Sequence, residues 1–126
     1  MLYEDLKDNE MIIWFDERAE IGPRALGHRS ILALPQHKET KDAINLVKQR
    51  QSWRPVAPII LKEYQDDILV NAKDSRFMLR TFFIKNDKVK QLQAVAHFDL
   101  SSRIQTISKE DDFFLFYESA AGALPP

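Results

Sequence analysis

The chain has 126 residues, of which 44% are hydrophobic, and a formal net charge of -1. This length suits one domain with a real core, and the hydrophobic fraction excludes a disordered chain. The near-neutral charge argues against a general nucleic-acid-binding protein, and the absence of cysteine excludes disulfides and thiolate metal sites. No apolar run approaches a membrane span and the N-terminus lacks a signal-peptide pattern, so we expect no membrane association and a cytoplasmic location.

The first part of the chain predicts short elements joined by well-marked turns. Residues 2–10 predict a short helix, and the continuous apolar run over 11–15 predicts a strand that is buried on both faces. Residues 16–27 are polar and carry Gly and Pro, which predicts a loop. A second strand is expected over 30–34, where Pro35 closes it.

The middle of the chain predicts a helix followed by an edge strand. Apolar side chains recur at helical spacing over 40–50, with Thr40 as the expected N-cap. We expect Trp53 to anchor the end of this helix. Residues 56–61 predict a strand, and their prolines place its start at an edge or a bulge.

The remaining elements complete an α+β pattern. Residues 64–69 predict a helix, 77–84 a strand, 87–93 a turn or short helix, 102–107 a strand and 111–121 a final helix. Because strands and helices do not alternate strictly, we expect an α+β fold with one twisted mixed sheet flanked by helices. The last residues resemble a connection more than a domain end, so we expect a domain, 1–126, that is truncated at its C-terminal end.

One group of basic residues predicts an anion-binding pocket. The stretch Gly22–Ser30 contains two glycines and a proline, which together make a stiff turn that aims side chains. Guanidinium groups bind phosphate and carboxylate oxygens in bidentate fashion. The basic residues near predicted element ends are Arg24, Arg29, Lys48, Arg54 and Arg103. The alternative is that each of them caps a helix, pairs with a nearby acid or lies in solvent.

Three segments in order resemble a known family of carbamoyltransferases. They are EIGPRALGHRSILALP (residues 20–35), DAINLVKQRQSWRPVAPIIL (42–61) and AHFDLSSRIQTI (96–107). The second is similar to the family's Asn-x-x-Lys and Arg-Pro-x-Ala-Pro patterns, and the third to its His-x-Asp-Gly-x-Ala-Arg-x-Gln-Thr pattern. The family includes nodulation-type and antibiotic-biosynthesis O-carbamoyltransferases.

The resemblance implies both a fold and a division of labour. Family members have an N-terminal domain that binds iron and carbamoylates a hydroxyl group, and a C-terminal domain that resembles YrdC proteins. The C-terminal domain uses ATP and carbamoyl phosphate to make carbamoyl adenylate. The resemblance therefore implies that this chain is a single YrdC-like domain of a transferase, with the N-terminal domain as its partner, in the same or a separate chain.

The family pattern also assigns the site. It implies Lys48 and Arg54 as the catalytic residues of the phosphate-and-carbamoyl site, with Arg24 and Arg103 completing a clamp around the substrates. Further candidates are Arg29, His28 and His97. Leu100 stands where the family has Gly, and Ser102 where it has Ala, so the turn that aims Arg103 departs from the pattern. A family Ser-x-Asn element would fall beyond Pro126, so we expect the isolated chain to be inactive.

The remaining residues bear on metal binding and on alternative functions. The three histidines lack the spacing of a metal site on one helix, so we expect none. Magnesium could accompany ATP, beside the acids at 66–67, 110–112 or 16–17. His97 could instead be a strand-end histidine paired with Asp99. The alternative functions are a non-catalytic YrdC-like module for nucleotide or double-stranded RNA, and a docking fragment; too few excess cations make nucleic acid the weaker choice.

Overall fold

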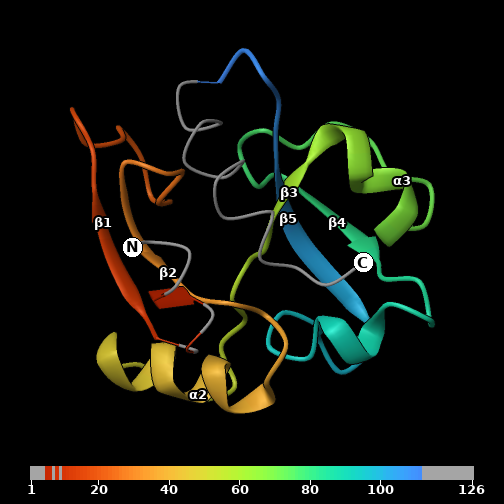
Figure 1. Cartoon of the computed structure of the whole chain (residues 1–126), viewed down its shortest axis with the longest axis horizontal. Coiled ribbons are helices and arrows are strands. Elements are labelled where there is room, and N and C mark those ends of the chain that lie inside the picture. The colour runs from red at the N-terminus through yellow and green to blue at the C-terminus, as the bar shows by residue number, and fades with distance from the viewer. Residues whose placement is uncertain (1–4, 7, 9, 112–126) are drawn as a thin grey trace. The chain divides into compact units, whose positions relative to one another are not determined.

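A computed structural model describes residues 5, 6, 8 and 10–111 of the chain. The chain divides into two compact units. The first comprises residues up to Leu34 together with those from Ser108 onward, and the second is Pro35–Ile107. Figure 1 shows the ribbon, in which each unit contains its own small sheet.

The first unit is built on an antiparallel pair of strands. β1 (Ile12–Phe15) pairs with β2 (Arg29–Leu32), with Ile13 opposite Ile31. Side chains alternate along a strand, so Ile13 and Phe15 share one face, and they are 72% and 73% exposed. The prediction that both faces of this strand are buried is therefore wrong, because a continuous apolar run does not show which face lacks a covering layer. The predicted loop between these strands is confirmed.

The second unit contains the mixed sheet. Its strands are β3 (Ile59–Leu61), β4 (Arg80–Phe83) and β5 (Ser101–Ile107). The order is β3-β5-β4, so β5 is central, parallel to β3 and antiparallel to β4, as Figure 1 shows. The buried core consists of Ile60, Leu69, Ile84 and Ile104.

Helices lie before and between these strands along the chain. They are α2 (Lys38–Val47), η1 (Lys62–Tyr64), α3 (Gln65–Ile68) and η2 (Val89–Gln91). The N-cap of α2 is His37, and Thr40 is buried within the helix, where its N–H donates to the His37 carbonyl at 3.1 Å. The prediction of Thr40 as the N-cap is wrong because the helix starts earlier than its apolar periodicity indicates. None of the helices in the described residues is long and apolar enough to cross a membrane.

The α+β class with a mixed sheet is confirmed. The described strands nevertheless form two sheets, because β1 and β2 pair only with each other. Residues 5 and 6 are helical, as expected for the first helix. The predicted final helix, 111–121, falls almost wholly outside the described residues.

Candidate functional site

The segment that follows α2 is folded around one buried amide. Asn45 is 0% exposed. Its Nδ2 donates to the carbonyls of Ser52 and Arg54, at 2.9 Å each, and its Oδ1 accepts a hydrogen bond from Nε of Arg50. Because a buried amide and buried carbonyls are costly without partners, these bonds fix the path of residues 48–55. Asn45 therefore fixes the backbone positions from which the cationic side chains of this segment extend.

The helix itself ends in a tight reversal. The N–H of Gln49 donates to the Leu46 carbonyl, and that of Arg50 to the Asn45 carbonyl, at 3.0 Å each. Gln49 has φ of 49°, which is the left-handed conformation that ends many helices. Arg50 is then held by Asn45 and by the Pro55 carbonyl, which accepts from Nη2 at 3.2 Å. The guanidinium of Arg50 thus has a fixed position.

Three cations of the second unit interact electrostatically with Arg50. Desolvation by burial, and then the charges of Arg54 and Arg103, lower the pKa of Arg50. Partial desolvation, and then the charge of Arg50, lower the pKa of Lys48. Among the described residues, no ion pair between one of these cations and a carboxylate is present. We call Lys48, Arg50, Arg54 and Arg103 the cation cluster.

Three members of the cation cluster were predicted and one was missed. Lys48, Arg54 and Arg103 were candidates, and the structure places each of them near Arg50 or near a charge that acts on it. Arg50 was missed because the family pattern marks Lys48 and Arg54 on either side of it. The feature of the sequence that could have identified Arg50 is its position at the end of a helix, five residues after Asn45.

Arg103 is positioned by the centre of the sheet. It lies on β5 opposite Thr81 of β4, between the fully buried side chains of Ser102 and Ile104. Its Nε is buried and makes no hydrogen bond to any residue that the structure describes. A buried N–H without a partner is an unsatisfied donor, which a bound oxygen would satisfy.

The turn before β5 is closed by hydrogen bonds among three residues, which we call the relay: His97, Asp99 and Ser101. Asp99 Oδ1 accepts from the Ser101 hydroxyl at 2.6 Å and from its N–H at 3.0 Å, and Ser101 Oγ lies 3.1 Å from His97 Nδ1. The hydroxyl hydrogen is directed at the carboxylate, so Nδ1 of His97 carries a hydrogen. Bonds from Ser101, the side chain first, lower the pKa of Asp99. His97 and Asp99 are thus linked through Ser101 and not as a direct pair.

The two departures from the family pattern have visible structural consequences. Leu100 has φ of 64°, a conformation that glycine adopts without the strain a Cβ introduces. Ser102 is 0% exposed and its hydroxyl donates to the Val95 carbonyl at 2.9 Å. The turn is therefore retained with leucine, and the extra hydroxyl is satisfied.

A pocket of about 340 Å³ adjoins these two segments within the second unit. Its lining includes Trp53, Pro55, residues 94–96, His97 and Phe98. Trp53 is 70% exposed, so the prediction that it anchors the helix end is wrong; Asn45 does this instead. The Arg54 guanidinium carbon lies 5.9 Å from the centre of the Trp53 ring.

The predicted arginines of the first unit have a different environment. Arg29 donates from its guanidinium to the carbonyls of Asp16, Glu17 and His28, at 2.6, 2.6 and 2.9 Å. Its Cζ also lies 4.0 Å from the centre of the Phe15 ring. Arg29 therefore joins the two ends of the loop between β1 and β2.

A half-buried acid organises the same loop. Glu20 Oε1 accepts from the N–H groups of Leu26, His28 and Arg29, at 2.6, 2.9 and 3.4 Å. Desolvation raises the pKa of Glu20, but these backbone bonds outweigh it and lower the pKa to about 2. The loop is held from within by a carboxylate that stays charged.

Arg24 and His28 lie on this loop as well. Both are half-buried, and the Nε of Arg24 and the Nδ1 of His28 are buried without a hydrogen bond to a described residue. The candidate clamp of Arg24 with the cation cluster stays a prediction.

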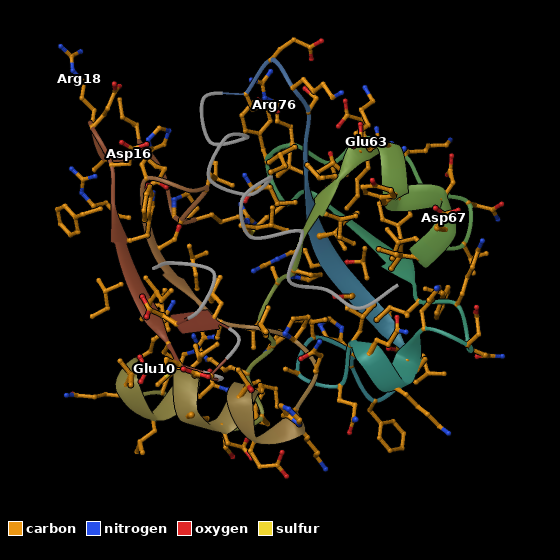
Figure 2. All side chains as sticks on the ribbon, viewed as in Figure 1. Glu10, Asp16, Arg18, Glu63, Asp67 and Arg76 are labelled. Atoms are coloured by element: carbon orange, nitrogen blue, oxygen red, sulfur yellow. The ribbon has the colours of Figure 1, made fainter. Side chains whose placement is uncertain are left out.

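The acids expected to accompany magnesium belong to both units. Asp67 extends from α3 of the second unit, and Asp16 lies in the loop of the first unit (Figure 2). Glu110 and Asp111 accept hydrogen bonds from Ser108. The described residues contain no group of three or more His, Asp or Glu that could hold a metal ion.

Comparison with known proteins gives one consistent result. Residues 3–118 match the family model described as carbamoyltransferase C-terminus. An uncharacterised protein of Methanocaldococcus jannaschii is 41% identical over 83% of this chain and 20% of its own length. Nodulation protein U of Azorhizobium caulinodans is 40% identical over 82% of this chain and 19% of its own length.

A third relative extends the comparison. Nodulation protein NolNO of Sinorhizobium fredii is 41% identical over 84% of this chain and 16% of its own length. The chain thus spans at most about a fifth of the length of these relatives. The segments that carry Asn45, the cation cluster and the relay before β5 all lie inside the matched residues. By this match, the chain belongs to the carbamoyltransferase C-terminal family.

Proposed function

We propose that this chain is the part of an O-carbamoyltransferase that binds ATP and carbamoyl phosphate and joins them into carbamoyl adenylate. The observation that supports the proposal most directly is the cation cluster. Arg50, Arg54 and Arg103 come from a loop and a sheet strand, yet the charges of Arg54 and Arg103 both act on Arg50. Keeping like charges close costs free energy, and a highly charged anion offsets that cost.

The chemistry requires such a cluster. Water first cleaves carbamoyl phosphate into carbamate and phosphate. A carbamate oxygen then forms a bond to the α-phosphorus of ATP, and the bond to pyrophosphate breaks. Both steps bring anions together, so catalysis consists of positioning and of offsetting charge, without a protein nucleophile.

The members of the cation cluster suit different parts of this task. Arg50 is fixed by Asn45 and Pro55, which makes it a stationary positive charge at the base of the site. Arg54 and Arg103 present planar forks that match phosphate oxygens. Lys48 is a compact charge on a flexible stem, suited to the carbamoyl and phosphate groups as they separate.

Transfer to the acceptor hydroxyl is assigned to the remainder of the larger enzyme. The relatives are about five times as long as the matched region, which leaves room for an N-terminal domain that would hold iron and the acceptor. Magnesium would arrive with the nucleotide phosphates, because this ion commonly binds through phosphate oxygens and water with only one or two protein carboxylates.

The first test is binding. Calorimetric titration with ATP and with carbamoyl phosphate should show weak, millimolar affinity for each. Arg54→Ala should weaken both at least tenfold, since a charge-assisted hydrogen bond contributes about 1.5–3 kcal/mol. The matched control is Arg18→Ala, whose exposed side chain extends from the loop of the first unit (Figure 2). Absence of binding by an intact fold, or equal loss in the two variants, would reject the proposal.

The second test is turnover. Pyrophosphate release that depends on carbamoyl phosphate should be slow or undetectable with the 126-residue chain alone. It should rise when the remaining family domain is supplied. Titration with double-stranded RNA in parallel tests the binding-module alternative, which predicts tighter binding to RNA than to ATP.

A further inference from the structure

One face of the β1–β2 sheet presents apolar side chains to solvent. Residues that lie opposite each other on paired strands share a face, so Ile13 lies beside Ile31, and Phe15 beside Arg29. Ile13 and Phe15 are 72% and 73% exposed, whereas Ile31 and Arg29 are half-buried. We call these four residues the outer face of the first unit.

The charged member of the outer face already has hydrogen-bond partners. The Arg29 guanidinium donates to the carbonyls of Asp16, Glu17 and His28, and its Cζ lies 4.0 Å from the centre of the Phe15 ring. The guanidinium is therefore held over the ring, and the two side chains form one surface. Aromatic and arginine side chains are enriched where protein surfaces meet.

The sequence of β1 predicts a second covering layer. The residues from Met11 to Phe15 form a continuous apolar run, which is typical of strands covered on both faces, whereas an antiparallel strand with one face in water normally alternates with polar residues. The other face of this sheet is covered, because Ile12 and Trp14 are half-buried and Ser30 is buried. The described part of the chain does not supply the layer for the outer face.

The extent of the outer face indicates what covers it. Four side chains of this size bury roughly 400–600 Å² when they are fully covered. A stable complex of separate proteins buries about 800 Å² on each partner, so this face alone would not hold a second copy of the chain. Domains of one polypeptide pack through smaller contacts, because their linkage provides an effective concentration in the millimolar range.

The relatives contain a further part of this kind. The chain spans at most about a fifth of their length, and the family model that it matches is described as the carbamoyltransferase C-terminus. Most of the remaining length of the relatives therefore precedes the matched region. The first described strand after that junction is β1.

We propose that the outer face is the docking surface for the remaining family domain, which covers Ile13 and Phe15 with an apolar surface of its own. The inference rests on the part of the proposed function that assigns the chain to a larger enzyme, and it does not depend on the cation cluster. It adds the location of the contact, on the β1–β2 sheet of the first unit.

The absence of cysteine from the chain allows this face to be probed at a single position. Ile13→Cys is compared in the 126-residue chain alone and in a fusion that places the remaining family domain of Azorhizobium caulinodans nodulation protein U before it. Maleimide labelling is followed by mass spectrometry of the peptide that contains residue 13. We expect labelling to be at least about tenfold slower in the fusion, since an affinity of about 0.1 mM suffices at a millimolar effective concentration.

Two controls accompany this comparison. Leu79 lies in the second unit and is 70% exposed, so Leu79→Cys matches Ile13→Cys in accessibility. Its labelling rate should differ by less than about twofold between the chain alone and the fusion, because a singly exposed apolar residue needs no partner. Ile13→Thr keeps the β-branched shape and should shift the melting temperature of the chain alone by no more than about 2 °C.

The outcomes separate this inference from the proposed function. Fast labelling of Ile13→Cys in a folded, monodisperse fusion would overturn the inference. Slow labelling in the chain alone would overturn it as well: dependence on protein concentration would mean that a second copy covers the face, and independence that the chain covers it itself. Calorimetric titration of Ile13→Thr with ATP should give an affinity within about twofold of the native chain. Protection in the fusion without any ATP binding would reject the proposed function and leave the docking surface.

Discussion

Two arginine-bearing loops of this chain use their arginines in opposite ways. In the first unit, the Arg29 guanidinium donates to three backbone carbonyls and lies over Phe15, so its hydrogen bonds are made within the protein. In the second unit, a neutral amide, Asn45, binds the carbonyls, and Arg54 keeps its guanidinium for other partners. An arginine in a loop can therefore either hold the backbone or leave its guanidinium accessible, and what binds the nearby carbonyls distinguishes the two.

The turns of these loops differ as well. The loop of the first unit has positive φ at two glycines, Gly22 and Gly27, and at one residue with a side chain, Glu17, whose φ is 39°. The turns beside the cation cluster in the second unit have positive φ only at residues with side chains, Gln49 and Leu100. Glycine has no Cβ to strain at such positions, so the loop of the first unit bears less of this cost.

The largest expected effect is the loss of the amide that organises the second unit. Asn45→Ala removes three hydrogen bonds and leaves two carbonyls and the Nε of Arg50 without their partner. We expect a loss of about 3 kcal/mol in the free energy of unfolding, measured by urea denaturation. The control is Gln93→Ala, an exposed amide that donates to the Lys90 carbonyl, for which we expect about 0.5 kcal/mol or less. Similar losses in both variants would contradict this role.

The second-largest expected effect is the difference in stability between Arg29→Ala and Arg54→Ala. Arg29→Ala should lower the free energy of unfolding by about 2 kcal/mol, because three charge-assisted bonds to carbonyls are lost. Arg54→Ala should change it by about 0.5 kcal/mol or less, since it also relieves repulsion with Arg50. Thermal unfolding of the two variants in parallel measures this difference. A reversed order would show that Arg54 is the structural residue.

Acid titration tests the carboxylate of the first loop. The pKa of Glu20 is about 2 in the folded chain, below its ordinary value of 4.5. The stabilisation by Glu20 should therefore be fully present above pH 4.5 and be lost as the pH falls toward about 2. Glu20→Gln should be less stable than the native chain at neutral pH, by about 1 kcal/mol after solvent screening, and the difference should shrink toward pH 2. A difference that does not depend on pH would rule out this assignment.

The smallest expected effect concerns the turn before β5. Leu100→Gly places the residue that left-handed φ favours at a position with φ of 64°. We expect a gain of about 0.5–1 kcal/mol, reduced by the greater freedom of glycine in the unfolded chain. Chemical denaturation measures it, with Leu79→Gly as an exposed leucine for control. A loss of stability in Leu100→Gly would mean that the leucine side chain contributes more than its backbone costs.

The sequence predicted most elements but not their roles. Hydrophobic patterns located β1, β2, α2 and β5 to within a few residues, because their apolar spacing is regular. The prediction that β1 is buried on both faces was wrong, since a continuous apolar run does not show which face is covered. Thr40 was taken for a cap because its residue type favours caps, although the helix begins earlier.

The sequence predicted most of the residues in the candidate site, but only part of how these residues are held in place. Lys48, Arg54 and Arg103 were identified through the family pattern, whereas Asn45 and Arg50 were not assigned a role. Their contribution depends on hydrogen bonds across a reversal of the chain, and no local pattern encodes which carbonyl an amide will bind. Trp53 was taken for an anchor because tryptophan is commonly buried, yet its neighbours are held by Asn45 and the ring lies in solvent.

The central position of β5 has a consequence for the order of assembly during synthesis. Arg54 leaves the ribosome almost fifty residues before Arg103, and the parallel pairing of Ile59 with Gln105 cannot form until the later strand is available. Parallel pairing between such distant segments is slow because the intervening chain must first be closed into a loop. The cation cluster is therefore completed only when β5 emerges, so a nascent chain that ends before β5 carries Arg50 and Arg54 without Arg103.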